Sequence, residues 1–180
     1  MLNQLILLLR SEKRFMDTIP MYMGHLNQLK KKQKKNIIIF GFGGAGEAIL
    51  RCFYKLYPKS KFQVVSKKKY IKGFSKNRVQ FIKKIDQNFL SLADLFINCS
   101  PLGSDLNKKY LTKTPLNKIH FQNINSNLLV FDIVYKPSKT LLSKLCNFYS
   151  IKYINGLKMN TVQAQKALKI IHENYKTNVI

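Results

Sequence analysis

The chain has 180 residues, of which 46% are hydrophobic and 12% aromatic. This is enough apolar side chain for one folded domain, or one domain with a fragment of another, and it excludes a compositionally disordered protein. The formal net charge is +24, but 28 of the 32 basic residues are lysine. Specific nucleic-acid recognition leans on arginine, and a lysine excess also fits A/T-rich coding, so nucleic-acid binding is the lesser explanation of the charge.

The three cysteines, at positions 52, 99 and 146, are widely spaced and form no C-x-x-C pair. The sequence therefore predicts neither a disulfide framework nor a zinc site, and it favours a reducing cytoplasm. The apolar run Leu5–Leu9 is too short to cross a bilayer and has no basic segment before it, so we expect no membrane span and no signal peptide.

The first 35 residues have a mixed pattern. Residues 2–9 fit a strand or equally a helix, residues 14–19 fit a strand, and Pro20 ends this pattern. Residues 21–29 fit a short helix. The basic run 30–35 is most simply a solvated linker.

From Asn36 onward, strand-like and helix-like segments alternate. Apolar runs predict strands at 37–40, 62–65, 78–82, 95–99, 128–135 and 152–154. Helical patterns cover 47–56, 88–94, 139–149 and 159–175. Such alternation with short links predicts an α/β fold, a doubly wound parallel sheet of the Rossmann-like class with right-handed crossovers.

A glycine-rich turn follows the first of these strands. Gly41, Gly43 and Gly46 form the pattern G-x-G-x-x-G, with an additional Gly44, and a helix is predicted directly afterwards. The first glycine permits a tight turn, the second lets backbone N–H groups approach a pyrophosphate, and the third lets the helix pack close to the strand. The sequence therefore predicts a dinucleotide site, the alternative being a strand-to-helix turn that binds nothing.

The end of the second strand indicates which dinucleotide. An NAD site of this type usually places an acidic residue there to hold the ribose 2′-hydroxyl. This chain has Ser66 followed by Lys67, Lys68 and Lys69, and no acid. A carboxylate would repel a 2′-phosphate and lysines would attract one, so we expect NADP, although each lysine is weak evidence in so basic a chain.

Three later motifs resemble those of one enzyme family. Residues 97–103, INCSPLG, are similar to its I-N-x-T-P-x-G turn. Residues 132–142, DIVYKPSKTLL, resemble its D-x-x-Y-x-P-x-x-T-x-L segment, and residues 155–164, NGLKMNTVQA, resemble N-G-x-x-M-x-x-x-Q-A. The family is that of the shikimate dehydrogenases, and the resemblance covers about residues 20 to 176. It implies an NADPH-dependent reduction of 3-dehydroshikimate to shikimate in aromatic amino-acid biosynthesis.

The resemblance also implies site residues. The pyrophosphate would lie on Gly41, Gly43, Gly44 and Ala45. The 2′-phosphate would lie near Ser66, Lys67 and Lys68, where the family has Asn-Arg-Thr. The nicotinamide side would be formed by Ser100, Ile133 and Gly156, and the substrate would face Asn3, Tyr135 and Gln163. Each has a plainer alternative: Tyr135 as a core residue, Gln163 as an exposed helix position, and Asp132 as a brace at a strand end.

By the same resemblance, residues 1–29 are a remnant of the catalytic domain with its linker helix, residues 30–35 a linker, and residues 36–180 the NADP-binding domain, whose helix 159–175 returns toward the substrate. The family's catalytic lysine would lie before Met1, and its catalytic aspartate position is Met21. We therefore expect a truncated enzyme of reduced activity. The alternatives are a catalytically degenerate NADP-binding protein and a basic nucleic-acid-binding module. We also expect self-association or a partner chain.

Overall fold

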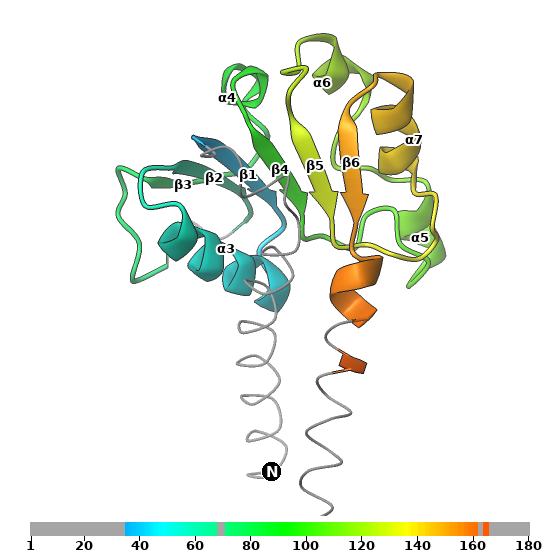
Figure 1. The fold of residues 1–180 in the computed structure, drawn as a ribbon, viewed down its shortest axis with the longest axis horizontal. Coiled ribbons are helices and arrows are strands. Elements are labelled where there is room, and N and C mark those ends of the chain that lie inside the picture. Colours follow the sequence, from blue (N-terminus) through cyan, green and yellow to red (C-terminus); the bar gives the residue numbers. More distant parts are fainter. Residues whose placement is uncertain (1–34, 68–70, 162–163, 166–180) are drawn as a thin grey trace, which may run out of the picture.

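The structure, a computed structural model, describes residues 35–67, 71–161 and 164–165. Six parallel strands form one sheet in the order β3-β2-β1-β4-β5-β6. Their bounds are β1 Asn36–Phe40, β2 Lys61–Val65, β3 Val79–Ile82, β4 Leu95–Asn98, β5 Leu129–Asp132 and β6 Lys152–Asn155. The strand order reverses between β1 and β4, which is where such sheets bind nucleotides. The predicted doubly wound α/β fold is confirmed (Figure 1).

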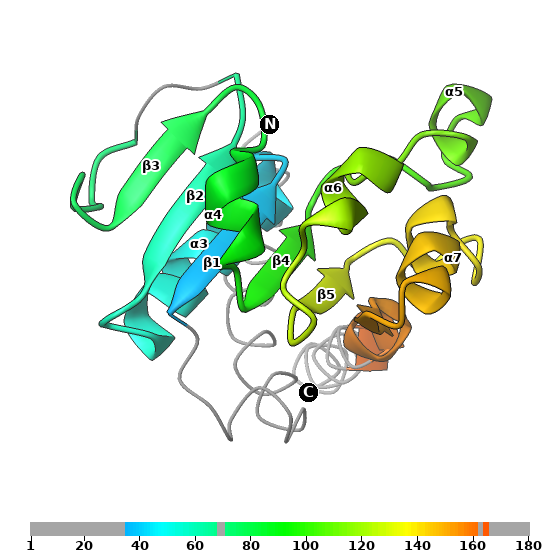
Figure 2. The same cartoon turned by 90° about the horizontal axis from the view of Figure 1, so that it is seen from above.

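Helices cover both faces of the sheet. On one face lies α3, Gly44–Leu56, together with Met159 of the helical residues 157–161. The other face carries α4 Gln87–Ser91, α6 Lys118–Gln122 and α7 Leu141–Phe148, which follow one another across the sheet (Figure 2). A further short helix is α5, Lys108–Leu111. In the described part of the chain, no helix combines the length and the apolar character needed to cross a membrane.

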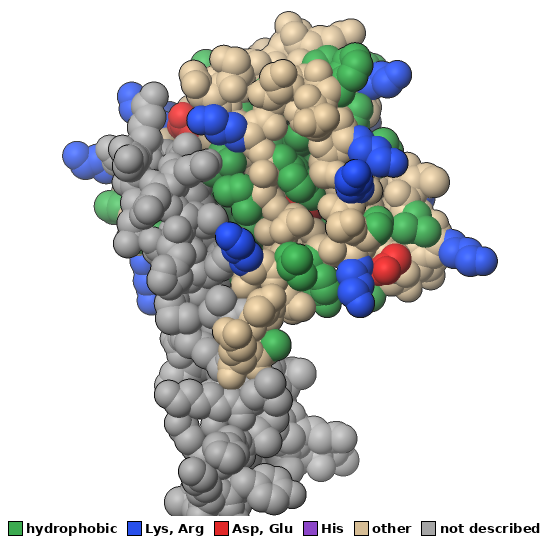
Figure 3. All heavy atoms as spheres, turned by 45° about the vertical axis from the view of Figure 1, so that its right-hand side comes forward, with side chains coloured by type: hydrophobic (Ala, Val, Ile, Leu, Met, Phe, Trp, Pro, Cys, Tyr) green, Lys and Arg blue, Asp and Glu red, His purple; other side chains and the backbone are tan. Residues whose placement is uncertain are grey.

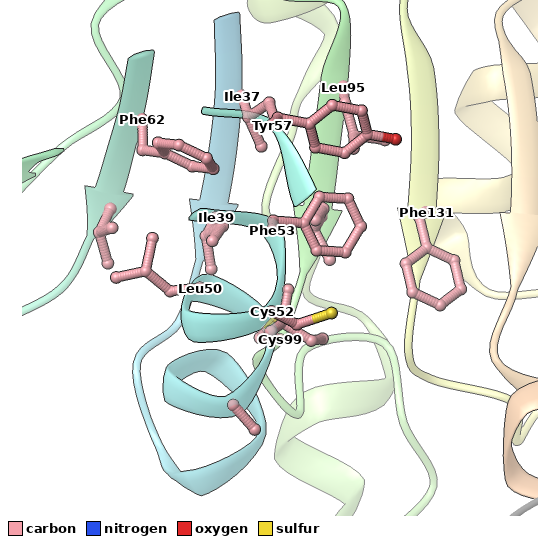
Figure 4. Close-up of a cluster of buried hydrophobic side chains, with 14 of the residues drawn as sticks. Ile37, Ile39, Leu50, Cys52, Phe53, Tyr57, Phe62, Leu95, Cys99 and Phe131 are labelled. Carbon is pink, nitrogen blue, oxygen red and sulfur yellow. The ribbon is translucent and has the colours of Figure 1, made fainter. Parts of the chain in front are cut away.

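The packing of α3 fixes the glycine turn against the sheet. Its residues Ile49, Leu50 and Phe53 have no exposed surface. They pack in one cluster with Ile37 and Ile39 of β1 (Figure 4). Truncating a buried phenylalanine such as Phe53 to alanine costs about 3–5 kcal/mol, so this helix is held firmly in place.

The structure differs from the predicted bounds at several element ends. Helix α3 begins at Gly44, three residues before the predicted start, because the glycines themselves enter its first turn. Strand β5 ends at Asp132 instead of continuing to Tyr135, because the Asp132 side chain accepts a hydrogen bond from the backbone N–H of Val134 and turns the chain.

Helices α5 and α6 were not predicted. Both are short, and α6 is started by a capping box in which His120 replaces the usual glutamate or glutamine. The Nδ1 atom of His120 accepts a hydrogen bond from the N–H of Asn117, and the Asn117 side chain accepts one from the N–H of His120. A start signal of this kind is easily missed in a sequence.

Candidate dinucleotide-binding site

Two glycines of the turn are required by the fold itself. Gly41 has a φ of +93°, and a Cβ placed on it would lie 2.9 Å from the backbone nitrogen of Ser100. A Cβ on Gly46 would lie 2.3 Å from the carbonyl oxygen of Gly41. Since side chains at these positions would collide with backbone atoms, Gly41 and Gly46 let β1 turn tightly and α3 pack against it.

The other two glycines have a different surrounding. A Cβ on Gly43 or Gly44 would meet no atom of the described residues within 4 Å, so the described fold does not require glycine there. Gly43 is the N-cap of α3, and no side chain among the described residues caps this helix end. The first-turn backbone N–H groups, Ala45 among them, and the positive end of the helix dipole lie beside the β1/β4 reversal, and helix starts of this kind suit an anion.

The end of β2 borders the same edge of the sheet. Gly41 N–H donates to the carbonyl of Val65, and Ser66 N–H donates to the carbonyl of Ile82, at 3.0 and 2.8 Å. Ser66 is half-buried and Lys67 is exposed. Lys83 and Lys84, which follow β3, are exposed as well. This corner of the described chain therefore has cations where a 2′-phosphate would be placed.

A buried carboxylate lies at the carboxyl ends of the next strands. Asp132 has no exposed surface, and burial raises the pKa of its carboxyl from 3.8 to about 6, against the lowering effect of its hydrogen bonds. Its Oδ1 accepts from Asn98 Nδ2 at 2.9 Å, and its Oδ2 accepts from the Tyr153 hydroxyl at 3.0 Å. Strands β4, β5 and β6 are thus joined through side chains at this edge.

The cysteines carry no reactive chemistry in this arrangement. Cys99 and Cys146 are buried, and burial raises the pKa of both thiols, that of Cys146 to about 12, with a further contribution from Asp132. The pKa of the Cys52 thiol rises to about 11 for the same reason. A thiol is a poor nucleophile or metal ligand until it ionises. No cluster of metal-binding side chains occurs among the described residues.

Comparison with known proteins agrees with this geometry. No family model matches the chain. A shikimate dehydrogenase (NADP(+)) of Prochlorococcus marinus strain MIT 9215 is 30% identical over 172 residues, which is 89% of this chain and 59% of that protein. A crystal structure of shikimate dehydrogenase 1 from Peptoclostridium difficile matches with a TM-score of 0.66 and 25% identity, over 88% of this chain and 54% of that one.

Another match is shikimate 5-dehydrogenase from Listeria monocytogenes, in complex with shikimate and NAD. It has a TM-score of 0.61 and 25% identity, over 83% of this chain and 55% of that one. The chain is a partial match to the shikimate dehydrogenases. The resemblance predicted from its motifs is confirmed, and the chain spans 59% of the length of the Prochlorococcus relative.

Against this shikimate dehydrogenase framework, the three residues predicted on the nicotinamide side lie at neighbouring strand ends. A Cβ on Gly156 would lie 2.3 Å from the carbonyl oxygen of Ile133, so β6 and β5 meet there backbone to backbone. Ser100 is half-buried, and its hydroxyl donates to Asn98 Oδ1 at 2.7 Å. That hydroxyl therefore shapes its own turn.

The predicted substrate residues are less well placed by the structure. Tyr135 is half-buried, three residues after the end of β5. Asn3, Met21, Lys68 and Gln163 lie outside the described residues. The domain division, including helix 159–175, also stays a prediction.

Sequence reasoning missed the polar network around Asp132. Asp132 was considered only as a brace at a strand end, and Asn98, Thr140 and Tyr153 received no role. A usable signal was present: Asn98 and Asp132 each end a strand that is otherwise apolar and buried. A polar side chain in that position is buried and needs partners.

Proposed function

We propose that residues 36–180 are the NADP(H)-binding domain of an oxidoreductase of the shikimate dehydrogenase type. The observation that carries this proposal is the uncapped start of α3, where Gly43 and Gly44 leave open space for a pyrophosphate. The acid-free end of β2 favours NADP over NAD, as does the NADP(+) in the relatives' names. The NAD in the Listeria structure shows that a related protein also accepts the other cofactor.

The proposed reaction is the reduction of 3-dehydroshikimate to shikimate in aromatic amino-acid biosynthesis. NADPH supplies the hydride to the carbonyl carbon, and a proton must reach the carbonyl oxygen. The chain's own residues would bind and orient the cofactor and the substrate. The glycine turn with Ala45 would hold the pyrophosphate, and Ser66, Lys67 and Lys68 would hold the 2′-phosphate. Ser100, Ile133 and Gly156 border the nicotinamide, and Asn3, Tyr135 and Gln163 face the substrate.

The proton-transferring group is the open part of this proposal. The family's catalytic aspartate aligns with Met21, and a thioether can neither ionise nor relay a proton. We therefore propose low turnover by this chain alone. The same observation favours a second candidate function, an NADP-binding protein without catalysis.

An assay of shikimate-dependent NADP⁺ reduction by the whole chain tests the proposal and distinguishes the two candidates. Shikimate dehydrogenase activity predicts NADPH formation above the buffer rate, lowered in a Tyr135→Phe variant that loses the hydroxyl proposed to face the substrate. No formation by a chain that still binds NADPH would contradict the enzymatic proposal and leave the non-catalytic one.

The basic charge gives little support to a nucleic-acid module. On the face seen in Figure 3, Lys and Arg side chains are spread singly or in small groups, with apolar and polar side chains between them. Nucleic-acid binding through them would weaken steeply with salt, and filter binding at two salt concentrations would detect this. We further propose a cytoplasmic location, because Cys52, Cys99 and Cys146 are all buried, free thiols.

A further inference from the structure

A polar network joins the last residues of β4 and β5 to β6. Each strand contributes one side chain: Asn98 from β4, Asp132 from β5 and Tyr153 from β6. Thr140, the N-cap of α7, completes it. Asn98 and Asp132 have no exposed surface and Thr140 is 1% exposed, whereas Tyr153 is half-buried, so the Asp132 carboxylate itself is shielded from solvent.

Every contact of the Asp132 carboxylate is made within the protein. Oδ1 accepts from Asn98 Nδ2 at 2.9 Å and from Val134 N–H at 3.0 Å. Oδ2 accepts from the Tyr153 hydroxyl at 3.0 Å and from the Thr140 hydroxyl at 3.4 Å. Four donors occupy both oxygens, so Asp132 is placed to hold other groups and has no free oxygen to offer a ligand.

The groups that Asp132 holds border the carboxyl edge of the sheet, where the dinucleotide is proposed to bind. Asn98, fixed through its amide NH₂, uses its Oδ1 to accept from both the backbone N–H and the hydroxyl of Ser100, at 3.0 and 2.7 Å. The bond to Val134 fixes the turn directly after Ile133. The carbonyl of Ile133 in turn lies against Gly156.

In a doubly wound sheet, the dinucleotide lies across the carboxyl ends, with one half over each set of three strands. The glycine turn, α3 and the end of β2 serve the adenosine half. We propose that Asp132 is the positioning residue for the other half: it sets the Ser100 turn and the Ile133–Gly156 contact that receive the nicotinamide riboside. This inference rests on the proposed NADP(H) function.

The two halves can be tested separately with two probes, NADPH and adenosine 2′,5′-bisphosphate, which lacks the nicotinamide half. In Asp132→Ala, the Val134 N–H loses its side-chain acceptor, and Asn98 Nδ2 keeps only its 3.3 Å bond to the Leu102 carbonyl. We expect NADPH affinity to fall by at least about tenfold, while affinity for the bisphosphate stays within about twofold of the unsubstituted chain.

Asp132→Asn is the matched control. Its side-chain oxygen still accepts from Asn98 and Val134, and its NH₂ group faces two hydroxyls that can rotate to accept. We expect it to recover most of the NADPH affinity. Tyr153→Phe removes a single donor to Asp132 and should lower NADPH affinity, by less than Asp132→Ala does, while leaving bisphosphate affinity unchanged. This variant tests the inference if Asp132→Ala does not fold.

Equal weakening of both probes in these variants, or unchanged NADPH affinity, would overturn the inference. A failure of the unsubstituted chain to bind either probe would overturn the proposed function itself and the inference with it. Calorimetric titration of the two probes therefore distinguishes the two failures.

Discussion

At the scale of single residues, Asp132 shows how a buried carboxylate is kept in an apolar strand. Removing it from water raises its pKa to about 6, and the donors from Asn98, Val134, Tyr153 and Thr140 offset only part of that cost. It remains ionised at neutral pH, where those donors are best satisfied. Burial of the Asp132 carboxylate therefore lowers stability, while its hydrogen bonds fix the positions of Asn98, Val134 and Tyr153.

This burial predicts a pH dependence of stability. The folded pKa lies above the ordinary value of 3.8, so between about pH 4 and pH 6 the folded state binds more protons than the unfolded state, and stability falls as pH rises through this window. The rise of the Asp132 pKa from 3.8 to about 6 corresponds to a loss of about 3 kcal/mol of stability across this window. Asp132→Asn should lack this loss in urea unfolding measured at the two ends of the window.

His120 has the opposite sign, because burial lowers its pKa and stability gains as pH rises toward its ordinary value. His120 is present in both the Asp132→Asn variant and the unsubstituted chain. The difference between their pH curves of stability therefore reports the Asp132 carboxylate alone. Parallel pH curves for the two proteins would contradict the assignment.

Lys67 carries a prediction on cofactor choice. Lys67→Glu places a carboxylate at the end of β2, where it would repel a 2′-phosphate and suit a ribose hydroxyl. We expect NADPH affinity to fall several-fold, corresponding to about 1 kcal/mol for an exposed charge, with NADH affinity unchanged or higher. Lys59→Glu makes the same charge change at the other end of β2, where Lys59 is also exposed. It should leave the ratio of NADPH affinity to NADH affinity unchanged. Equal effects of both variants would point to net charge instead.

At the scale of elements, the turn between β1 and α3 combines two kinds of glycine. Gly46 is required because a Cβ would collide with the Gly41 carbonyl, whereas Gly43 faces open space with an unstrained φ of −90°. The motif alone does not distinguish these two roles. The structure shows that the fold requires glycine at position 46 and places no such requirement on position 43.

The two glycines should therefore respond differently to the same substitution. Gly43→Ala should cost less than about 1 kcal/mol of stability, the usual effect at an N-cap, yet weaken NADPH binding by placing a methyl group in the path of the pyrophosphate. Gly46→Ala should cost at least about 2 kcal/mol through the backbone collision. Thermal unfolding with NADPH titration measures both. Normal NADPH affinity in Gly43→Ala would argue against a pyrophosphate at this turn.

Elements differed in how far the sequence predicted them. The strands followed directly from apolar runs, because both faces of this sheet are covered and β1, β4 and β5 are nearly continuous in apolar residues. Helices α5 and α6 have four and five residues, too few for a periodic pattern. The Asp132 network was out of reach for spacing arguments, since its partners Asn98 and Tyr153 are 34 and 21 residues away along the chain.

At the scale of the whole molecule, the described residues form one six-stranded parallel sheet with helices on both faces, and the chain matches just over half of its relatives' length. Apolar side chains remain on its surface, among them Phe148 at 78% and Leu157 at 51% exposure. The predicted apolar stretch at residues 2–9 lies outside the described part. We expect the protein to self-associate or to pair with another chain, and light scattering would show a mass above that of one chain. A monodisperse monomer would contradict this.

We propose above all that the carboxyl edge of this sheet binds NADP(H). Calorimetric titration of the whole chain with NADPH and with NADH tests it most directly. We expect saturable binding of NADPH at one site per chain, with NADH at least about tenfold weaker because it lacks the 2′-phosphate. No binding of either cofactor, or equal affinity for the two, would contradict it.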